Sequence, residues 1–357
     1  MADQPTPAAS ETPVHDVIII GAGPAALSAA IYTTREDIDT LLFERGVVGG
    51  LAAITDWVDN YPGFPKGVAG LTLADELREQ AERFGAVIEL GEVSKLADEG
   101  KYKRLTTTSG DMLAKAVLIA TGSDYKKVGV PGEQEYYAHG VHYCATCAGA
   151  FYRDKRLVVV GGGNSAVQEA MFLTRFASHI DMLVRGPEFR ASEILQHDLM
   201  NKHQDKITVH FNTTTDEIVG QDGKVVKVVG TDKTTGQKVD FETDGVFVFV
   251  GLKPNTEFLQ GAKDAGTEGA ADAAKETAGE APAASTATVE LDEIGFIKSD
   301  DKLETAMPGV FVAGDVHSGA TMQIASAVGE GATAALRIRE FLDEHGRKHG
   351  GSGAVEQ

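Results

Sequence analysis

The chain has 357 residues, enough for about two domains, since a domain takes roughly 150 residues. Hydrophobic residues make up 42% and charged residues 24%, so the composition is that of a folded protein and excludes wholesale disorder. The formal net charge of −20 would repel phosphate backbones and anionic lipids, which argues against nucleic acids and membranes as partners. Because concentrated salt screens such a charge, the acidic excess predicts a halophilic protein.

The start of the chain carries no pattern typical of export. It lacks a basic segment followed by an apolar one, and no window of the chain approaches about 18 consecutive apolar residues. The sequence therefore predicts a cytoplasmic protein.

Three segments have compositions that cannot bury a core. They are the tails 1–13 and 346–357 and an acidic insertion at 261–290.

The folded part is expected to begin with a buried strand, a tight turn and a helix. An apolar, β-branched run at 17–20 precedes residues 21–26, which spell Gly-Ala-Gly-Pro-Ala-Ala, and the small residues of 24–32 have helical character. The form G-x-G-x-x-A lets a pyrophosphate approach the backbone at a helix N-terminus. Glu44 ends the next apolar strand, at the distance expected of an acid that binds a ribose. The first set of predicted nucleotide-binding residues is Gly21, Gly23, Pro24, Ala26, Glu44 and Arg45.

The same order of strand, glycine turn and helix returns about 140 residues later. An apolar run at 157–160 leads into Gly-Gly-Gly-Asn-Ser-Ala at 161–166, which predicts a second nucleotide-binding fold. The next strand-like run, 180–184, ends in Arg185 instead of an acid, and Arg190 follows. Guanidinium groups suit a 2′-phosphate, with solvated loop arginines as the alternative interpretation. The second set of predicted residues is Gly161, Gly163, Asn164, Ser165, Ala166, Arg185 and Arg190.

Further apolar runs end at or next to glycines and predict more buried strands of an α/β fold. They occupy 116–120, 246–250 and 310–313. The last of them runs into Gly314 and Asp315, ahead of a helical stretch at 323–342. We expect the Asp315 carboxylate to accept hydrogen bonds from a polyol chain beside a helix N-terminus, with an ordinary helix cap as the alternative.

Cys144 and Cys147 are the only cysteines and have the spacing C-x-x-C. In a cytosolic chain this spacing predicts a redox dithiol, in which one thiolate attacks a disulfide and the other resolves the mixed intermediate. Zinc is the competing interpretation, because His139 and His142 add two nitrogen ligands, but structural zinc sites usually draw on two separated ligand pairs. We expect no metal. His142 is also a candidate acid and base for the thiolate, with a plain packed histidine as the alternative.

These motifs follow the order found in the low-molecular-weight thioredoxin reductases, which the chain resembles from about Val14 to Leu342. The matching motifs are Gly21–Ala25, Gly49–Gly50, Asn60–Gly63, Ala120–Gly122, Cys144–Cys147, Gly161–Ala166, Pro254–Thr256 and Gly314–Val316. The resemblance implies two Rossmann-like dinucleotide-binding domains, the second inserted into the first. The FAD-binding domain would comprise 14–126 and 252–345, and the NAD(P)-binding domain with the cysteines would comprise 127–251.

The resemblance also assigns roles to single residues. Asn60 would lie beside the flavin ring, Cys147 would face the flavin, and Cys144 would attack thioredoxin. It implies a thioredoxin-like partner and a homodimer in which the inserted domain swings. It adds to the flavin-binding set Gly50, Leu51, Thr121, Gly122, Gln323 and Ile324.

Several positions depart from the family pattern. Ala148 stands where the family has an aspartate that donates a proton, so either His142 or another group substitutes, or the reaction is altered. Near the flavin, Leu51 replaces a usual glutamine and the segment 322–324, Met-Gln-Ile, replaces Arg-Gln-Ala, which predicts a shifted flavin potential.

The basic cluster for NADPH is also thinner than in the family, because only Arg185 and Arg190 are present. NADPH, NADH and another donor therefore stay open. The leading prediction is an FAD-dependent thioredoxin reductase that uses NADPH or NADH. The alternatives are a dithiol oxidase, a reductase fed by a different electron donor, and a non-catalytic redox sensor.

Overall fold

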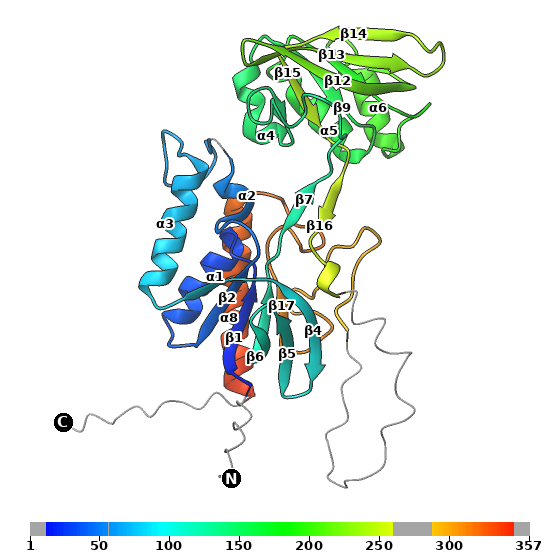
Figure 1. The fold of residues 1–357 in the computed structure, drawn as a ribbon. Coiled ribbons are helices and arrows are strands. Elements are labelled where there is room, and N and C mark those ends of the chain that lie inside the picture. The colour runs from blue at the N-terminus through cyan, green and yellow to red at the C-terminus, as the bar shows by residue number, and fades with distance from the viewer. Residues whose placement is uncertain (1–11, 56, 260–287, 346–357) are drawn as a thin grey trace, which may run out of the picture. The chain divides into compact units, whose positions relative to one another are not determined.

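The chain forms two compact units, each built around its own sheet, which is mixed in the first unit and parallel in the second (Figure 1). The computed structural model describes residues 12–55, 57–259 and 288–345. Most of both predicted tails and nearly all of the predicted insertion lie outside the described residues. The first unit comprises residues 1–57, 61–123 and 254–357, and the second comprises 58–60 and 124–253. No helix in the described part of the chain is both long and apolar enough to cross a membrane.

The first unit contains a seven-stranded sheet in the order β3-β2-β1-β6-β5-β4, with β17 paired to β6. Strands β3, β2, β1, β6 and β17 are parallel, whereas β4, β5 and the first half of β6 form an antiparallel meander. The predicted strand at 116–120 is the buried end of β6, which is longer than the apolar run suggested. The strands are β1 (Val14–Ile20), β2 (Thr40–Glu44), β3 (Val87–Leu90), β4 (Val93–Glu99), β5 (Tyr102–Thr107), β6 (Gly110–Ile119) and β17 (Val310–Val312).

Helices α1 (Pro24–Thr34) and α8 (Ile324–Glu344) pack closely against each other in this unit. The Ser28 hydroxyl donates to the Val328 carbonyl at 2.9 Å. A Cβ on Gly331 would lie 2.1 Å from the Ala25 carbonyl oxygen, so only glycine permits this approach. Both helices were predicted, and the structure confirms them with slightly later ends. The unit also contains α2 (Gly50–Ala53), α3 (Gly70–Arg83) and the 3-10 helix η2 (Glu257–Leu259).

The second unit has a parallel five-stranded sheet in the order β11-β10-β9-β15-β8. Its strands are β8 (Val141–His142), β9 (Arg156–Val160), β10 (His179–Leu183), β11 (Ile207–His210) and β15 (Gly245–Val248). The helices are α4 (Ala145–Ala148), the 3-10 helix η1 (Gly149–Tyr152), α5 (Asn164–Leu173) and α6 (Glu193–Lys202). With the sheet of the first unit, this gives the predicted α/β fold with two Rossmann-like domains.

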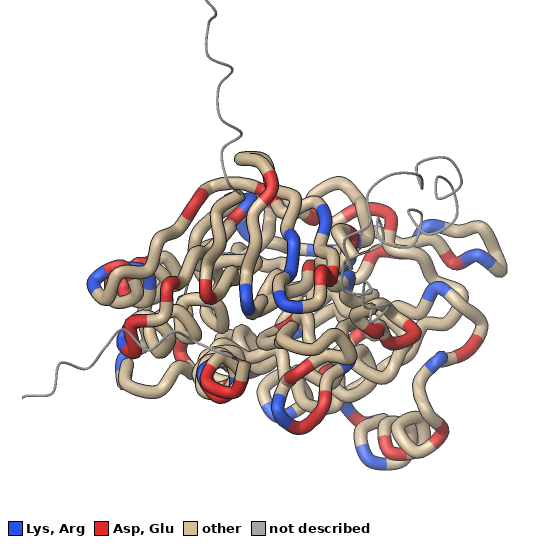
Figure 2. The backbone as a smooth tube through the Cα atoms, turned by 90° about the horizontal axis from the view of Figure 1, so that it is seen from below, with Lys and Arg blue, Asp and Glu red and all other residues tan. Residues whose placement is uncertain are grey.

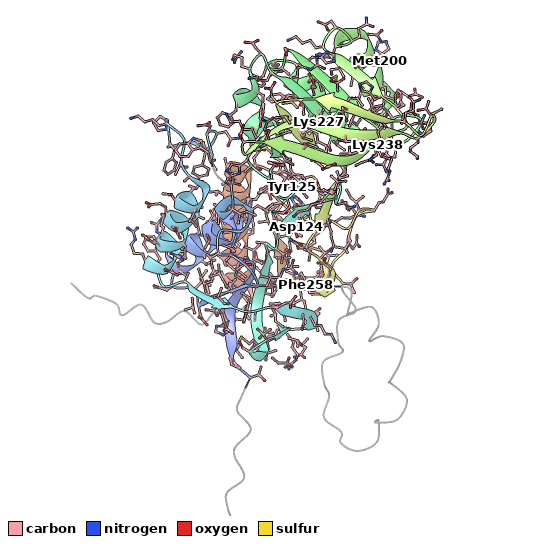
Figure 3. The ribbon with its side chains drawn as sticks, turned by 45° about the horizontal axis from the view of Figure 1, so that its top comes forward. Asp124, Tyr125, Met200, Lys227, Lys238 and Phe258 are labelled. Carbon is pink, nitrogen blue, oxygen red and sulfur yellow. A yellow bond between two sulfur atoms is a disulfide. The ribbon has the colours of Figure 1, made fainter. Side chains whose placement is uncertain are left out.

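An antiparallel three-stranded sheet, β12-β13-β14, completes the second unit and was not predicted. Its strands are β12 (Thr213–Gln221), β13 (Lys224–Asp232) and β14 (Lys238–Glu242). Figure 3 labels Lys227 on β13 and Lys238 on β14. The chain passes between the units through a paired two-stranded segment, β7 (Ser123–Tyr125) and β16 (Leu252–Pro254).

Candidate active site

The first glycine turn places a helix N-terminus without a side-chain cap at the end of β1. Gly21 has φ of +107°, and a Cβ there would lie 2.4 Å from the Ala120 carbonyl oxygen. Its N–H donates to the Phe43 carbonyl at 2.7 Å. Within the described structure no side chain caps α1, which begins at Pro24 after Gly23. The backbone amides of the first turn are thus available to an anion, as a pyrophosphate requires.

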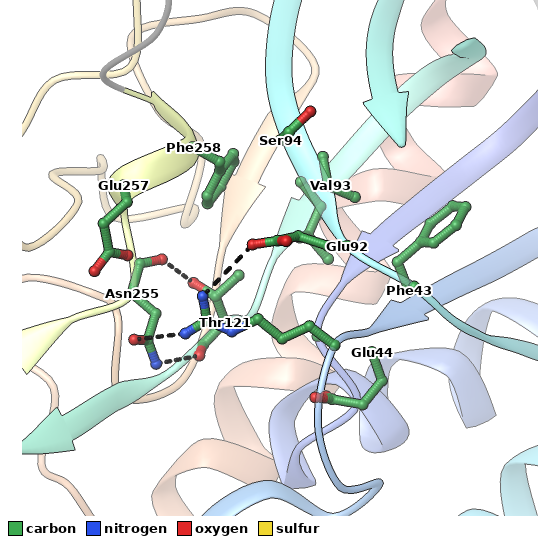
Figure 4. A pocket seen from close by; sticks show the side chains of 13 residues that line it. Phe43, Glu44, Glu92, Val93, Ser94, Thr121, Asn255, Glu257 and Phe258 are labelled. Atoms are coloured by element: carbon green, nitrogen blue, oxygen red, sulfur yellow. Dashed lines mark hydrogen bonds and ion pairs between the residues drawn. The ribbon is translucent and has the colours of Figure 1, made fainter. Parts of the chain in front are cut away.

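Glu44 ends β2 beside this turn. Its carboxylate accepts hydrogen bonds from Ala22 N–H at 2.8 Å and from Gly46 N–H at 2.7 Å, so the side chain is fixed next to the glycine turn. A cavity of about 280 Å³ opens here (Figure 4). Among its lining residues are Gly21, Glu44, Arg45, Glu92, Thr121 and Asn255. The structure therefore brings four of the predicted residues, Gly21, Glu44, Arg45 and Thr121, into one cavity.

Asn255 is a residue of this cavity that sequence analysis did not select. Its side-chain Nδ2 donates to the Thr121 backbone carbonyl at 3.0 Å, and its own backbone carbonyl accepts from the Thr121 hydroxyl at 2.7 Å. The Arg45 guanidinium donates to Asn255 Oδ1 at 3.1 Å (Figure 4). Asn255 thus joins two segments that are 134 residues apart. The motif Pro-Asn-Thr at 254–256 was visible in the sequence but carried no assigned role.

Asp315 follows β17 and is mostly buried. Burial, and then the neighbouring Glu330 carboxylate, raise the pKa of Asp315 to about 6. Glu330 itself accepts the Gly314 N–H at 2.8 Å, and a Cβ on Gly314 would lie 3.0 Å from Ala25 Cβ in α1. The alternative of Asp315 as the cap of α8 is wrong, because Gln323 occupies that position.

The other residues that the sequence predicted to bind flavin lie in several segments of the chain. The Gly49 N–H donates to the Ala22 carbonyl at 2.8 Å, and a Cβ on Gly50 would lie 3.6 Å from Gly23 Cα, so the segment 49–51 lies against the glycine turn. Gln323 caps α8 and Ile324 is its first residue, while Gly122 has φ of +68° beside Thr121. Asn60 belongs to the segment 58–60 that groups with the second unit, and its role stays a prediction.

The second glycine turn repeats the geometry of the first. Gly161 has φ of +143°, and a Cβ there would lie 2.3 Å from the Phe249 carbonyl oxygen. No side chain caps α5 in the described structure, and Gly163 holds the cap position. Asn164 Oδ1 accepts the Ser192 N–H at 2.8 Å, while Ser165 is exposed and Ala166 is buried in the first turn. Arg185 and Arg190 are both exposed and follow β10.

Cys144 and Cys147 form a disulfide at the start of α4. The Cys147 N–H lies 3.2 Å from the Cys144 sulfur, which caps the short helix, and Cys147 is the more exposed of the pair. A zinc site would need both sulfurs as thiolates, so the disulfide argues against that alternative. The described residues contain no cluster of three or more potential metal ligands.

Two aromatic contacts anchor the strand that leads into the cysteines. Tyr143 donates from its hydroxyl to the buried Glu133 carboxylate at 2.8 Å, and burial raises the pKa of this tyrosine. The preceding residue, His142, contacts different partners from Tyr143. Its Nε2 is hydrogen-bonded to the Tyr152 hydroxyl at 2.7 Å, and its ring centroid lies 5.2 Å from that of Phe247. Burial raises the pKa of Tyr152 to about 12, so Tyr152 stays a neutral partner for His142. Sequence analysis missed Tyr152.

Residues 15–331 match the model of the pyridine nucleotide-disulphide oxidoreductase family. A thioredoxin reductase of Bacillus subtilis is 39% identical over 335 residues, covering 94% of this chain and 97% of its own length. One from Listeria innocua is 38% identical over 94% of this chain and 96% of its own. The crystal structure of a thioredoxin reductase from Streptococcus pyogenes superposes with a TM-score of 0.81 at 36% identity, covering 94% of this chain and all of that one.

Two glycine turns at helix N-termini together with a disulfide are typical of one class of protein, the pyridine nucleotide-disulphide oxidoreductases. Within that family the chain belongs to the low-molecular-weight thioredoxin reductases.

Proposed function

We propose that this protein is a thioredoxin-disulfide reductase that passes electrons from NADPH or NADH through FAD to the disulfide Cys144–Cys147 and on to a thioredoxin-like protein. The observation that carries the proposal is the disulfide itself, in a chain with two separate glycine turns at helix N-termini. A disulfide between cysteines only three residues apart is typical of a catalytic pair, because the two sulfurs stay within bonding reach of each other in the reduced state. The names of the relatives point the same way.

The residues of the first unit fit FAD. The uncapped start of α1 suits the pyrophosphate, Glu44 suits a ribose, and the nearly buried Asp315 suits a polyol hydroxyl. Bound FAD would supply two-electron chemistry between a nicotinamide and the disulfide. The second unit, with Gly161, Gly163, Asn164, Ser165 and Ala166, would hold the nicotinamide nucleotide.

The two sulfurs would then act in sequence. The reduced Cys144 thiolate attacks one sulfur of the partner disulfide, and the other partner sulfur leaves as a thiolate that takes up a proton. The Cys147 thiolate attacks the Cys144 sulfur, which re-forms the bond between them and releases the second partner thiol. Two electrons and two protons are delivered in all. We infer that His142, held by Tyr152, exchanges protons with this dithiol in place of the aspartate that Ala148 replaces.

Anaerobic stopped-flow absorbance tests the proposal. The purified yellow protein is mixed separately with NADPH and NADH at molar salt, and thioredoxin reduction is then assayed with wild type and with Cys147→Ser. We expect rapid bleaching near 450 nm in both proteins and thioredoxin reduction in the wild type alone, with a loss of roughly 1000-fold or more in the variant, because it cannot resolve the mixed disulfide. If neither nucleotide bleached the flavin, a dithiol oxidase or another electron donor would replace the proposal.

We also infer a homodimer, from the family resemblance, and sedimentation of the FAD-loaded protein tests it. The cytoplasmic location and the halophilic character stay predictions from composition.

A further inference from the structure

Two carboxyl groups and one histidine meet beyond the end of β17. Asp315 and His317 belong to the loop after this strand, and Glu330 lies in the second turn of α8. The Glu330 Oε2 atom accepts the Gly314 N–H at 2.8 Å and lies 3.7 Å from His317 Nδ1. Only Asp315 of these three side chains has a part in the proposed flavin site, although His317 and Glu330 are each only 20% exposed.

The backbone holds this cluster in place from both sides. Gly331 follows Glu330 in α8, and because a Cβ on Gly331 would lie 2.1 Å from the Ala25 carbonyl oxygen, this turn of the helix lies directly against α1. The loop after β17 is joined to another segment, since the Ser318 N–H donates to the Ile297 carbonyl at 2.8 Å. The fold therefore sets the distance between the histidine and the glutamate, and their mutual attraction need not do so.

Hydrogen bonds determine which nitrogen of His317 carries a proton in the neutral ring. The Ser299 hydroxyl donates to the Asp300 carbonyl at 3.0 Å, so its oxygen is left to accept from His317 Nε2, which lies 3.0 Å away. Nδ1 is then the nitrogen without a hydrogen. Among the described residues this buried Nδ1 has no hydrogen-bond partner, and the atom nearest to it in charge is the Glu330 carboxylate oxygen. A second proton on the ring would turn this unfavourable contact into a charge-assisted ion pair.

The charge balance of the cluster depends on His317. Acidic and basic residues are interspersed along much of the chain (Figure 2), but no lysine or arginine in the described structure forms an ion pair with Asp315 or Glu330. A further acid, Asp292, is engaged elsewhere, because its carboxylate accepts from the Ser318 hydroxyl at 2.7 Å and from two backbone N–H groups at 3.0 Å. A protonated His317 is therefore the cation that the described residues offer to lessen the repulsion between Asp315 and Glu330.

We propose that His317 and Glu330 are positioning residues of the flavin site, in which a proton on His317 balances Glu330 and so keeps the Gly314 amide and the Asp315 carboxylate in place for the polyol chain of FAD. The inference rests on the proposed function, since it takes the first unit as the FAD site. When His317 loses this proton, Glu330 repels Asp315 and the turn between them is strained. The FAD-bound protein therefore holds the proton more tightly than the flavin-free protein, and by linkage the dissociation constant for FAD rises with pH.

Release of FAD tests the inference without turnover. The FAD-loaded protein is diluted at pH values between 7 and 9, and flavin fluorescence gives the dissociation constant. This range lies above the pKa of Asp315, about 6, so Asp315 is ionised throughout. His317→Gln can still donate a hydrogen bond to Ser299 but carries no charge, whereas His317→Lys carries a positive charge over the whole range.

His345→Gln is the matched control for the loss of a histidine. His345 is exposed and caps the C-terminus of α8, fifteen residues and therefore roughly 22 Å from Glu330 along the helix. At that distance salt screens its charge. Circular dichroism of each variant confirms that the protein is folded.

We expect the dissociation constant of the wild type for FAD to rise about fivefold from pH 7 to pH 9, as the histidine loses its proton. His317→Gln should bind FAD about fivefold more weakly than the wild type at pH 7 and show no further change up to pH 9. His317→Lys should bind tightly at both pH values, and His345→Gln should follow the wild type.

A dissociation constant of the wild type that does not change with pH would overturn the inference. So would a His317→Gln variant that keeps the pH dependence of the wild type, or a His317→Lys variant that binds as weakly as His317→Gln at pH 7, which would assign the effect to the shape of the imidazole. In each of these cases thioredoxin reduction by the FAD-loaded wild type would leave the proposed function intact. A wild type that bound no FAD at any pH would refute both.

Discussion

Both units contain a strand, a glycine turn and a helix in succession, but they differ in the charged residue found at or just after the end of the next strand. Gly21 and Gly161 have positive φ, and a Cβ on either would lie within 2.4 Å of a carbonyl oxygen of the neighbouring segment. The first unit places Glu44, at the end of β2, beside the turn, whereas in the second unit Arg185 follows β10. The glycine turn therefore suits the pyrophosphate, which the flavin and nicotinamide nucleotides share. The charged residue after the next strand, an acid in one unit and an arginine in the other, is the feature that differs between the two predicted sites.

The largest effect on nucleotide binding is expected from a substitution that disrupts one of the two glycine turns and leaves the other unchanged. A valine at either glycine would combine a strained φ with a clash against main chain, which costs about 3 kcal/mol or more. We expect Gly161→Val to lose nicotinamide nucleotide binding on the order of 100-fold while the protein stays yellow, and Gly21→Val to lose flavin instead. Absorbance spectra and nucleotide titration measure both.

Circular dichroism would confirm that each variant is folded. If Gly161→Val released flavin as well, the two turns would not serve separate ligands, and the comparison between the units would fail.

A second test uses the buried carboxyl group of the first unit. Because burial and Glu330 raise the pKa of Asp315 to about 6, the native flavin-free protein keeps a proton that the unfolded chain, with a pKa near 3.9, releases. The free energy of unfolding therefore falls as pH rises between about 4 and 6. Above that window Asp315 is ionised in the native state, and the destabilisation by its buried charge is complete. We expect Asp315→Asn to raise the free energy of unfolding by about 2 kcal/mol near pH 8 and hardly at all near pH 4.

Urea unfolding at the two pH values measures the difference. An equal gain at both would mean that the substitution acts through packing and that Asp315 ionises normally.

A third and smaller effect concerns Glu44. Both of its oxygens accept backbone N–H groups, from Ala22 and Gly46, and a glutamine would set an amide NH₂ against one of these donors. We expect Glu44→Gln to weaken FAD binding about tenfold, measured by flavin fluorescence on dilution. Glu92→Gln is the control, because Glu92 lines the same cavity but its carboxylate pairs, among the described residues, only with Arg45, at 3.9 Å. A similar loss in the control would point to the total charge of the cavity.

The sequence predicted those parts of the molecule that depend on local pattern. Apolar runs ending at Gly21, Gly161 and Gly314 marked buried strands, and the structure has β1, β9 and β17 there. The sheet β12-β13-β14 was missed because β12 begins with polar residues and β13 has its valines in pairs, so neither strand alternates apolar with polar residues. Gly230, which a close approach to the Thr214 carbonyl requires, also interrupts β13. Such strands carry a weak signal.

The residues that complete the sites were missed for a different reason. Asn255 reaches Thr121 across 134 residues, and nothing in its local spacing points to that partner. Tyr152 lies ten residues from His142, but η1 and the sheet, not the spacing, turn the two rings together. Tertiary contacts of this kind become visible only once the strand order is known.

The smallest expected effect concerns the proton that accompanies the dithiol. His142→Gln can keep a hydrogen bond to Tyr152 but cannot take up a proton near neutral pH, so it separates positioning from proton transfer. We expect thioredoxin reduction to slow on the order of threefold, because the exposed Cys147 also exchanges protons with water, and its dependence on pH between 6 and 9 to flatten. Flavin bleaching by the nucleotide should not change. Tyr152→Phe, which removes only the hydroxyl, should shift the pH profile without flattening it. A pH profile of His142→Gln identical to that of the wild type would assign proton exchange to solvent and leave His142 as a packed ring against Phe247.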